Sequence, residues 1–106
     1  MSTGTYPLAT LLTGVPYRLM AGHLDCAVQA LTADSRQVTA GTVFVAIRGQ
    51  QTDGHRFLDA ALDQGATALV VEDLTPQLLQ RVQAQGQTVV QVQQSRRALA
   101  ALANAY

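Results

Sequence analysis

The chain has 106 residues, with seven basic and seven acidic side chains and therefore no formal net charge when the histidines are neutral. All seven basic residues are arginine, so the sequence has no lysine for a Schiff base or for a phosphate-binding loop of the G-x-x-x-x-G-K-[ST] type. Only 13% of the residues are charged, which argues against a broad basic surface for nucleic acid.

The length fits a single domain over residues 1–106, and the 48% hydrophobic content predicts a globular fold with its own core. The single cysteine, Cys26, excludes an intramolecular disulfide and a cysteine metal cluster. The first residues lack the features of a signal peptide, and no apolar run approaches the length of a membrane span. We therefore expect a soluble protein of the cytoplasm.

The first forty residues carry the weaker patterns. Residues 8–12 have the composition of one or two helical turns, and Thr13-Gly14 would close them. Residues 26–32 alternate loosely between apolar and polar side chains, which is typical of a strand.

A near-repeat dominates the second half of the chain. Gly65 and Gly86 each follow an amphipathic segment, and each precedes a threonine and a β-branched run. A glycine at this place supplies the left-handed residue that ends a helix. Thr75 and Pro76 would begin the second helix as its cap and first residue. The buried faces of the two helices would contain Phe57, Leu58, Ala61 and Leu62 in the first and Leu78, Leu79 and Val82 in the second.

Three apolar runs alternate with these helices. Residues 42–47 and 68–71 are continuously apolar or β-branched, as expected for buried strands of a parallel sheet. Residues 89–92 are interrupted by Gln91, which places that strand nearer an edge. The order predicts an α/β fold with a small mixed or mostly parallel sheet flanked by helices.

A last helix is predicted from Ser95 as its N-cap to residue 105. Arg96 and Arg97 lie at its start, where positive charge opposes the helix dipole, so we expect them to face solvent or a neighbour. The helix reaches Tyr106 without a capping glycine, and we expect more protein to follow.

Two polar segments, residues 33–41 and 48–55, lie before and after the strand at residues 42–47. The second leaves a strand and enters a helix, the position at which α/β sheets bind ligands. Each residue also has a simpler interpretation: Asp53 caps a helix, Asp34 and Ser35 hold a turn, and His55 belongs to a helix terminus.

These residues alone give no recognisable catalytic or metal-binding arrangement. The two histidines are far apart and no second cysteine accompanies Cys26, so no metal-ligand spacing occurs. No Ser-His-Asp arrangement can be defended either. The spacing therefore predicts a binding domain that is not catalytic by itself.

An ordered series of motifs runs through residues 24–106. It comprises Asp34-Ser35-Arg36, Gly41, Phe44-Val45-Ala46, Gly49, Asp53-Gly54-His55, Gly65-Ala66 and Ser95-Arg96-Arg97-Ala98-Leu99-Ala100. This series resembles the N-terminal domain of the Mur ligases, the ATP-dependent amino-acid-adding enzymes of bacterial peptidoglycan synthesis. The resemblance implies that the domain holds the UDP part of UDP-N-acetylmuramoyl-peptide.

Carried over residue by residue, the resemblance implies that Ala33 and Ser35 contact the uridine diphosphate. It also implies that the loop of Gln50, Gln51 and Thr52 closes over the nucleotide. Asp34 and Arg36 would fix the turn that presents the Ser35 hydroxyl.

The resemblance places the rest of the enzyme beyond this chain. ATP, magnesium and an essential lysine would belong to a central domain, and a C-terminal domain would receive the amino acid. This chain would then hold no cofactor, no metal and no catalytic residue. The full enzyme would phosphorylate the substrate carboxylate, and the incoming amine would displace the phosphate.

Within the family, residues 52–55 and 96–100 look most like the MurE branch, the UDP-N-acetylmuramoyl-L-alanyl-D-glutamate ligases. The MurF branch shares the D-[ST]-R and D-G-H elements and remains an alternative. An alternative of another class is a non-catalytic protein-interaction module on the same fold.

Overall fold

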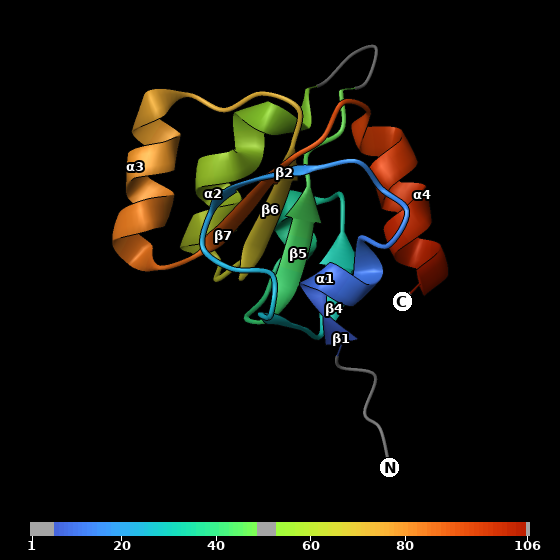
Figure 1. Ribbon diagram of the computed structural model, residues 1–106. Helices are drawn as coiled ribbons and strands as arrows, with labels where there is room; N and C mark the ends of the chain where they lie inside the picture. The colour runs from blue at the N-terminus through green and yellow to red at the C-terminus, as the bar shows by residue number, and fades with distance from the viewer. Residues whose placement is uncertain (1–5, 49–52, 106) are drawn as a thin grey trace.

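A five-stranded sheet forms the centre of the protein (Figure 1). The computed structural model describes residues 6–48 and 53–105. The strand order is β2-β7-β6-β5-β4, in which β4 to β7 run parallel and β2 is antiparallel to β7. The bounds of the strands are Arg18–Ala21 (β2), Ala30–Thr32 (β4), Thr42–Val45 (β5), Ala68–Val71 (β6) and Thr88–Gln91 (β7). This mostly parallel sheet confirms the predicted fold class.

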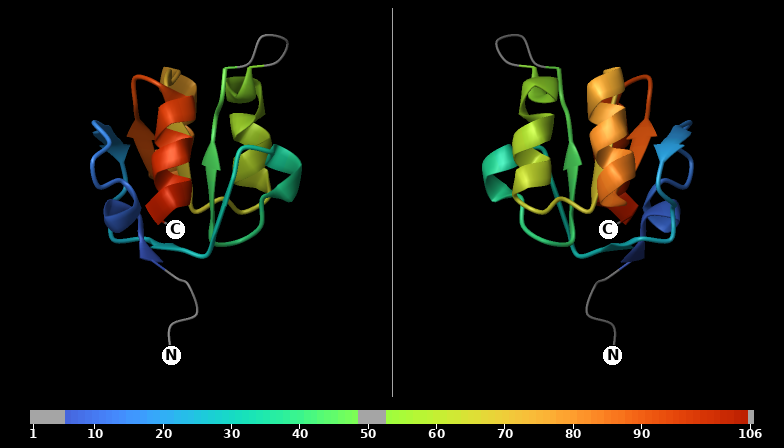
Figure 2. Two further views of the ribbon diagram at one scale, coloured as in Figure 1. Left: turned by 90° about the vertical axis from the view of Figure 1, so that its right-hand side faces the viewer. Right: turned by 90° about the vertical axis from the view of Figure 1, so that its left-hand side faces the viewer.

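Helices cover both faces of the sheet (Figures 1 and 2): α2 and α3 lie on one face, and α1 and α4 on the other. Their bounds are Leu8–Leu11 (α1), Leu58–Asp63 (α2), Pro76–Gln85 (α3) and Ser95–Ala105 (α4), with 3-10 turns at Ser35–Gln37 (η1) and Gly54–Phe57 (η2). A separate two-stranded sheet pairs β1 (Tyr6–Pro7) with β3 (Ala27–Val28). No helix in the described part of the chain is long and apolar enough to cross a membrane.

The alternation of side chains along the strands divides the core into two layers. Phe44, Leu69 and Val89 face α2 and α3, where they pack with Leu58 and Val82. The residues next to them in sequence face the other way. Those on the opposite face pack against α1 and α4, and they comprise Val43, Val45, Ala68, Val70, Val90 and Val92. β5 and β6 are therefore buried on both faces and β7 nearly so, as their apolar runs predict, whereas β4 at the edge is only partly buried.

The predicted ends of α2 and α3 and the predicted start of α3 are confirmed. Gly65 and Gly86 follow α2 and α3 with φ angles of 100° and 75°, in the left-handed region that glycine favours. The Thr75 hydroxyl caps α3 by accepting a hydrogen bond from the Leu78 amide at 3.2 Å. The predicted strands at residues 42–47, 68–71 and 89–92 correspond to β5, β6 and β7, and the helical turns at residues 8–12 correspond to α1.

One expectation about the strands is wrong. Residues 26–32 form two strands in different sheets, because β3 pairs with β1 whereas β4 pairs with β5. β7 lies nearer an edge than the central strand β6, as predicted, and β2 covers its outer side. Gln91 is polar there because it pairs with Arg18 and its side-chain amide donates to the Glu72 carbonyl at 3.0 Å. β2 was not predicted, since Arg18–Ala21 is a short edge strand with most side chains partly or fully exposed.

A close backbone contact joins the end of β2 to the start of β7. Gly22 has a φ angle of 75°, and a Cβ atom at this position would lie 2.4 Å from the Thr88 hydroxyl oxygen and 2.6 Å from the Gln87 carbonyl oxygen. The buried Thr88 hydroxyl donates to the His23 carbonyl at 3.0 Å and accepts from the His23 amide at 3.3 Å. Only glycine at position 22 allows this approach.

We predict that Gly22→Ala destabilises the protein more than Gly86→Ala. Both glycines have a φ angle of 75°, but no atom lies within 4 Å of a Cβ at Gly86. Gly86→Ala is the control, and it should lower the free energy of unfolding by about 1 kcal/mol because of the left-handed backbone alone. Gly22→Ala adds the clash and should lower the free energy of unfolding, measured in urea, by at least about 2 kcal/mol more. Equal losses would contradict the close contact.

Candidate functional site

The carboxyl ends of the parallel strands meet at one edge of the sheet, where open α/β folds bind their ligands. Of the predicted site residues, Ala33 and Ser35 lie at this edge directly after β4, and Ser35 begins η1. The predicted residues Gln50, Gln51 and Thr52 lie outside the described residues. The described site therefore consists of the segments that follow β4 and enter η2.

A side-chain clamp fixes the η1 turn, as predicted for Asp34 and Arg36. The Asp34 carboxylate accepts from the Arg36 amide at 2.9 Å and from its guanidinium at 3.0 and 2.9 Å. These hydrogen bonds lower the pKa of Asp34 below its ordinary value. The Gln64 amide, at the end of α2, donates to the Ser35 carbonyl at 2.7 Å. The Ser35 backbone is thus held from both sides, while its hydroxyl makes no hydrogen bond within the described residues.

A hollow of about 500 Å³ lies between the η1 turn and η2, and we call it the η1–η2 hollow. Its lining residues are Ala33, Asp34, Ser35, Arg36, Ile47, Gly54 and Phe57. The only cation among them is Arg36, which is already paired with a carboxylate. The hollow therefore suits an uncharged polar group with a planar apolar surface better than a free anion.

Phe57 lines the hollow but was not predicted to belong to the site. We expected it on the buried face of a helix with Leu58, Ala61 and Leu62, which are indeed buried. Phe57 instead ends the 3-10 turn η2, before α2 begins, and its side chain is 39% exposed. The change from 3-10 to α-helix rotates it off the buried face. An exposed aromatic ring beside a hollow offers a surface on which a planar group can stack.

A cluster of charges lies beside this hollow, where β5 and β6 end. The Arg48 guanidinium lies 3.5 Å from the Asp53 carboxylate and 3.4 Å from Glu72, and it also pairs with Asp73. Arg48 follows β5, and the two carboxylates at positions 72 and 73 follow β6. One guanidinium thus joins two strand ends and offsets the repulsion among three carboxylates.

His55 completes this cluster through both of its ring nitrogens. Its Nε2 accepts hydrogen bonds from the backbone amides of Glu72 at 2.9 Å and Asp73 at 3.2 Å. Nδ1 therefore carries the proton and donates to the Asp53 carboxylate at 2.7 Å. Asp53 also caps η2 by accepting from the His55 amide at 2.9 Å, which lowers the Asp53 pKa. His55 is a structural residue of a helix terminus, as expected, because neither nitrogen is free for proton transfer.

The start of α4 is capped from outside the helix. The Glu72 carboxylate accepts from the Ser95 amide at 2.7 Å and from its hydroxyl at 2.8 Å. These hydrogen bonds lower the pKa of Glu72 below its ordinary value, and the bond from the Ser95 amide has the largest effect. Ser95 was predicted to be the N-cap acceptor, which is wrong: it is the first helical residue, and its hydroxyl donates. No group of His, Cys, Asp or Glu side chains that could hold a metal occurs in residues 6–48 and 53–105.

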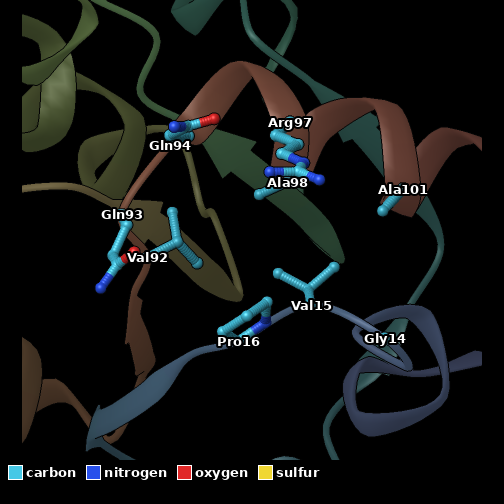
Figure 3. A pocket seen from close by; sticks show the side chains of 9 residues that line it. All are labelled: Gly14, Val15, Pro16, Val92, Gln93, Gln94, Arg97, Ala98 and Ala101. Carbon is cyan, nitrogen blue, oxygen red and sulfur yellow. The ribbon is translucent and has the colours of Figure 1, made fainter.

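A second hollow, of about 290 Å³, lies between α4 and the loop that precedes β2, and we call it the β7–α4 hollow (Figure 3). It shares no lining residue with the η1–η2 hollow. Its lining residues are Gly14, Val15, Pro16, Val92, Gln93, Gln94, Arg97, Ala98 and Ala101. Neither Ala33 nor Ser35 contributes to it.

Comparison with known sequences gives one consistent family. The family model described as "Mur ligase family, catalytic domain" matches residues 27–106. The UDP-N-acetylmuramoyl-L-alanyl-D-glutamate--2,6-diaminopimelate ligase of Bacteroides fragilis is 36% identical over 99 residues, which are 93% of this chain and 19% of that protein. The protein of the same name from Clostridium perfringens is 33% identical over 100 residues, again 93% and 19%. This chain spans about a fifth of the length of these relatives.

Solved structures agree on the fold. MurF from Acinetobacter baumannii superposes with a TM-score of 0.76 over 95% of this chain and 21% of that chain, at 19% identity. MurF ligase from Thermotoga maritima, solved in complex with ADP, gives a TM-score of 0.56 over 70% of this chain and 16% of that chain, at 36% identity.

We predict that the stability of the protein falls in acid partly through Glu72. Its pKa is lower in the folded than in the unfolded state, so the stabilisation is present above about pH 4.5 and is lost as the pH falls toward the folded value. Glu72→Gln should therefore lower the free energy of unfolding by about 1–2 kcal/mol at pH 7. In this variant the free energy of unfolding should also fall less steeply between about pH 5 and 3. Urea unfolding across this range measures both effects, and parallel pH profiles would contradict the assignment.

Proposed function

Because this chain belongs to the Mur ligase family and has the fold of its N-terminal domain, we propose that it binds the UDP moiety of UDP-N-acetylmuramoyl-peptide. The names of the relatives from Bacteroides fragilis and Clostridium perfringens include UDP-N-acetylmuramoyl-L-alanyl-D-glutamate. The proposal extends that nucleotide-linked substrate to the η1–η2 hollow of this chain.

The observation that carries the proposal is a single hollow lined by both Ser35, whose hydroxyl makes no hydrogen bond within the described residues, and the exposed Phe57. Ser35 sits in a turn that is clamped by Arg36 and by Gln64, so its position requires little ordering when a ligand binds. A uracil base has a planar face for stacking, and the ribose and base offer hydrogen-bond partners for a hydroxyl. The paired Arg36 leaves no free cation in this hollow, which favours the uridine end over the diphosphate.

The remaining predicted contacts complete the proposed site. Ala33 lines the hollow and offers backbone groups to the uridine diphosphate. Gln50, Gln51 and Thr52 stay proposed contacts of the nucleotide. Gly54 lies so close to the segment after β5 that a Cβ atom would be 2.7 Å from the Ile47 nitrogen, so only glycine fits at this position.

The proposed role is to hold the substrate and not to activate it. The family resemblance assigns ATP and magnesium to a central domain, and this chain has no lysine for a phosphate-binding loop. Tight binding of the nucleotide end would position a distant carboxylate for reaction in the full enzyme. In this proposal the chain works in the bacterial cytoplasm together with the central and C-terminal domains of a ligase.

Sequence favours a MurE-type parent over a MurF-type one. The two curated relatives named above are diaminopimelate-adding ligases and match 93% of this chain at 36% and 33% identity. The Acinetobacter baumannii MurF structures match at 19% identity, a level at which likeness supports the fold alone. The MurF structure from Thermotoga maritima is 36% identical, but over only 70% of the chain.

Calorimetric titration of the 106-residue chain with UDP tests the proposal. Phe57→Ala should weaken binding by about 1–3 kcal/mol through lost stacking. Ser35→Ala should weaken it by about 0.5–1.5 kcal/mol through one lost hydrogen bond. Tyr17→Ala is the matched control, because Tyr17 is an aromatic residue with a similar exposure of 41% that does not line the hollow.

The proposal would be supported if UDP gives saturable heat, if the Phe57 and Ser35 variants bind more weakly, and if the Tyr17 variant binds as tightly as the original chain. No saturable heat at millimolar UDP, or equal weakening by all three variants, would contradict it.

A further inference from the structure

The charges of this protein are unevenly paired. All seven acidic side chains lie within ion-pair distance of a histidine or an arginine. Three arginines, Arg36, Arg48 and Arg81, take six of these carboxylates, and His23 pairs with Asp25. The arginines without an acidic partner in the described part of the chain are Arg18, Arg56, Arg96 and Arg97.

Of these four, Arg97 lines the β7–α4 hollow. In Figure 3 its side chain reaches from α4 into the space above Val15. It lies in the first turn of α4, where the helix dipole disfavours a cation. The carboxylate at that helix start, Glu72, is already bonded to Ser95 and paired with Arg48. The charge of Arg97 is therefore uncompensated by any acidic side chain among the described residues.

The rest of the hollow combines apolar walls with a polar rim. Val92 and Ala98 are buried at its base, and Val15 and Pro16 form the opposite wall (Figure 3). The carboxamides of Gln93 and Gln94 lie at the rim, and a carboxamide can both donate and accept hydrogen bonds.

Backbone hydrogen bonds hold both sides of this hollow in place. The Val92 amide donates to the Val71 carbonyl at 2.8 Å, and the Val15 amide donates to the Leu12 carbonyl at 2.9 Å. The first turn of α4 is fixed by the bond from the Ala98 amide to the Gln94 carbonyl at 3.0 Å. The hollow is therefore formed before any ligand arrives.

We propose that the β7–α4 hollow binds a small organic anion, a carboxylate or phosphate group carried on a compact apolar body. The Arg97 guanidinium presents a planar fork of donors that matches both anionic groups. The apolar walls accept the body of the ligand, and the volume of about 290 Å³ limits it to a small molecule. This site is separate from the proposed nucleotide site and does not depend on it.

Amide NMR titrations of the 106-residue chain test this site with three probes of similar shape. Benzoate and phenyl phosphate carry the two anionic groups, and benzamide is their neutral counterpart. We expect saturable shifts at Val15 and at residues 93–98 with at least one anion, and binding of benzamide weaker by about tenfold or more. Comparison of the two anions identifies which group the site prefers.

Two arginine variants separate a site from a general effect of charge. Arg97→Gln should weaken anion binding by about tenfold or more, whereas Arg96→Gln should change it by less than about twofold. Both variants remove one exposed positive charge from the same helical turn, but Arg96 does not line the hollow. Ala101→Glu places a carboxylate one turn from Arg97 and should also abolish binding while α4 is retained.

Equal losses in the two arginine variants would overturn the proposal, because net charge alone would then explain the binding. If benzamide binds as tightly as benzoate, the hollow recognises only the apolar ring, and the proposal of an anion site is overturned as well. Absence of shifts at residues 93–98 with every probe would contradict it directly.

Discussion

The structure depends on one electrostatic constraint at the carboxyl edge of the sheet. Asp53, Glu72 and Asp73 gather there, and their mutual repulsion must be offset for β5 and β6 to end side by side. Arg48 supplies the positive charge, and the imidazole of His55 ties the Asp53 carboxylate to two backbone amides at the end of β6. Because Glu72 also caps α4, the same cluster sets where the last helix begins.

Two hollows of the described structure differ in their chemistry. In the η1–η2 hollow the only lining arginine is bound to Asp34, so shape, an aromatic ring and a hydroxyl remain for recognition. In the β7–α4 hollow the lining arginine has no acidic partner among the described residues, so charge remains available. We propose a nucleoside as the ligand of the first hollow and a small organic anion as the ligand of the second. The pairing of carboxylates therefore determines what each hollow can recognise.

Features that depend on neighbours in sequence were predictable. The cap of Thr75 on α3, the cap of Asp53 on η2 and the left-handed Gly86 each involve residues within one turn of the chain. Features that depend on distant partners were not. Glu72, 23 positions earlier in the chain, caps α4 in place of Ser95. Phe57 is not on the buried face because it belongs to the 3-10 turn that precedes α2. β2 was missed because a short edge strand is defined by pairing with β7 and not by its own pattern. The contacts of Gln50, Gln51 and Thr52 lie outside the described residues and remain predictions.

Mapping UDP onto the chain by amide NMR locates the nucleotide without any substitution, and it therefore tests the assignment of UDP to the η1–η2 hollow. We expect saturable shifts at Ser35 and its neighbours in η1, and at Phe57 and its neighbours in η2. We also expect shifts in the ring resonances of Phe57. Saturable shifts confined to residues 93–98, or none at millimolar UDP, would contradict the assignment of the nucleotide to the η1–η2 hollow.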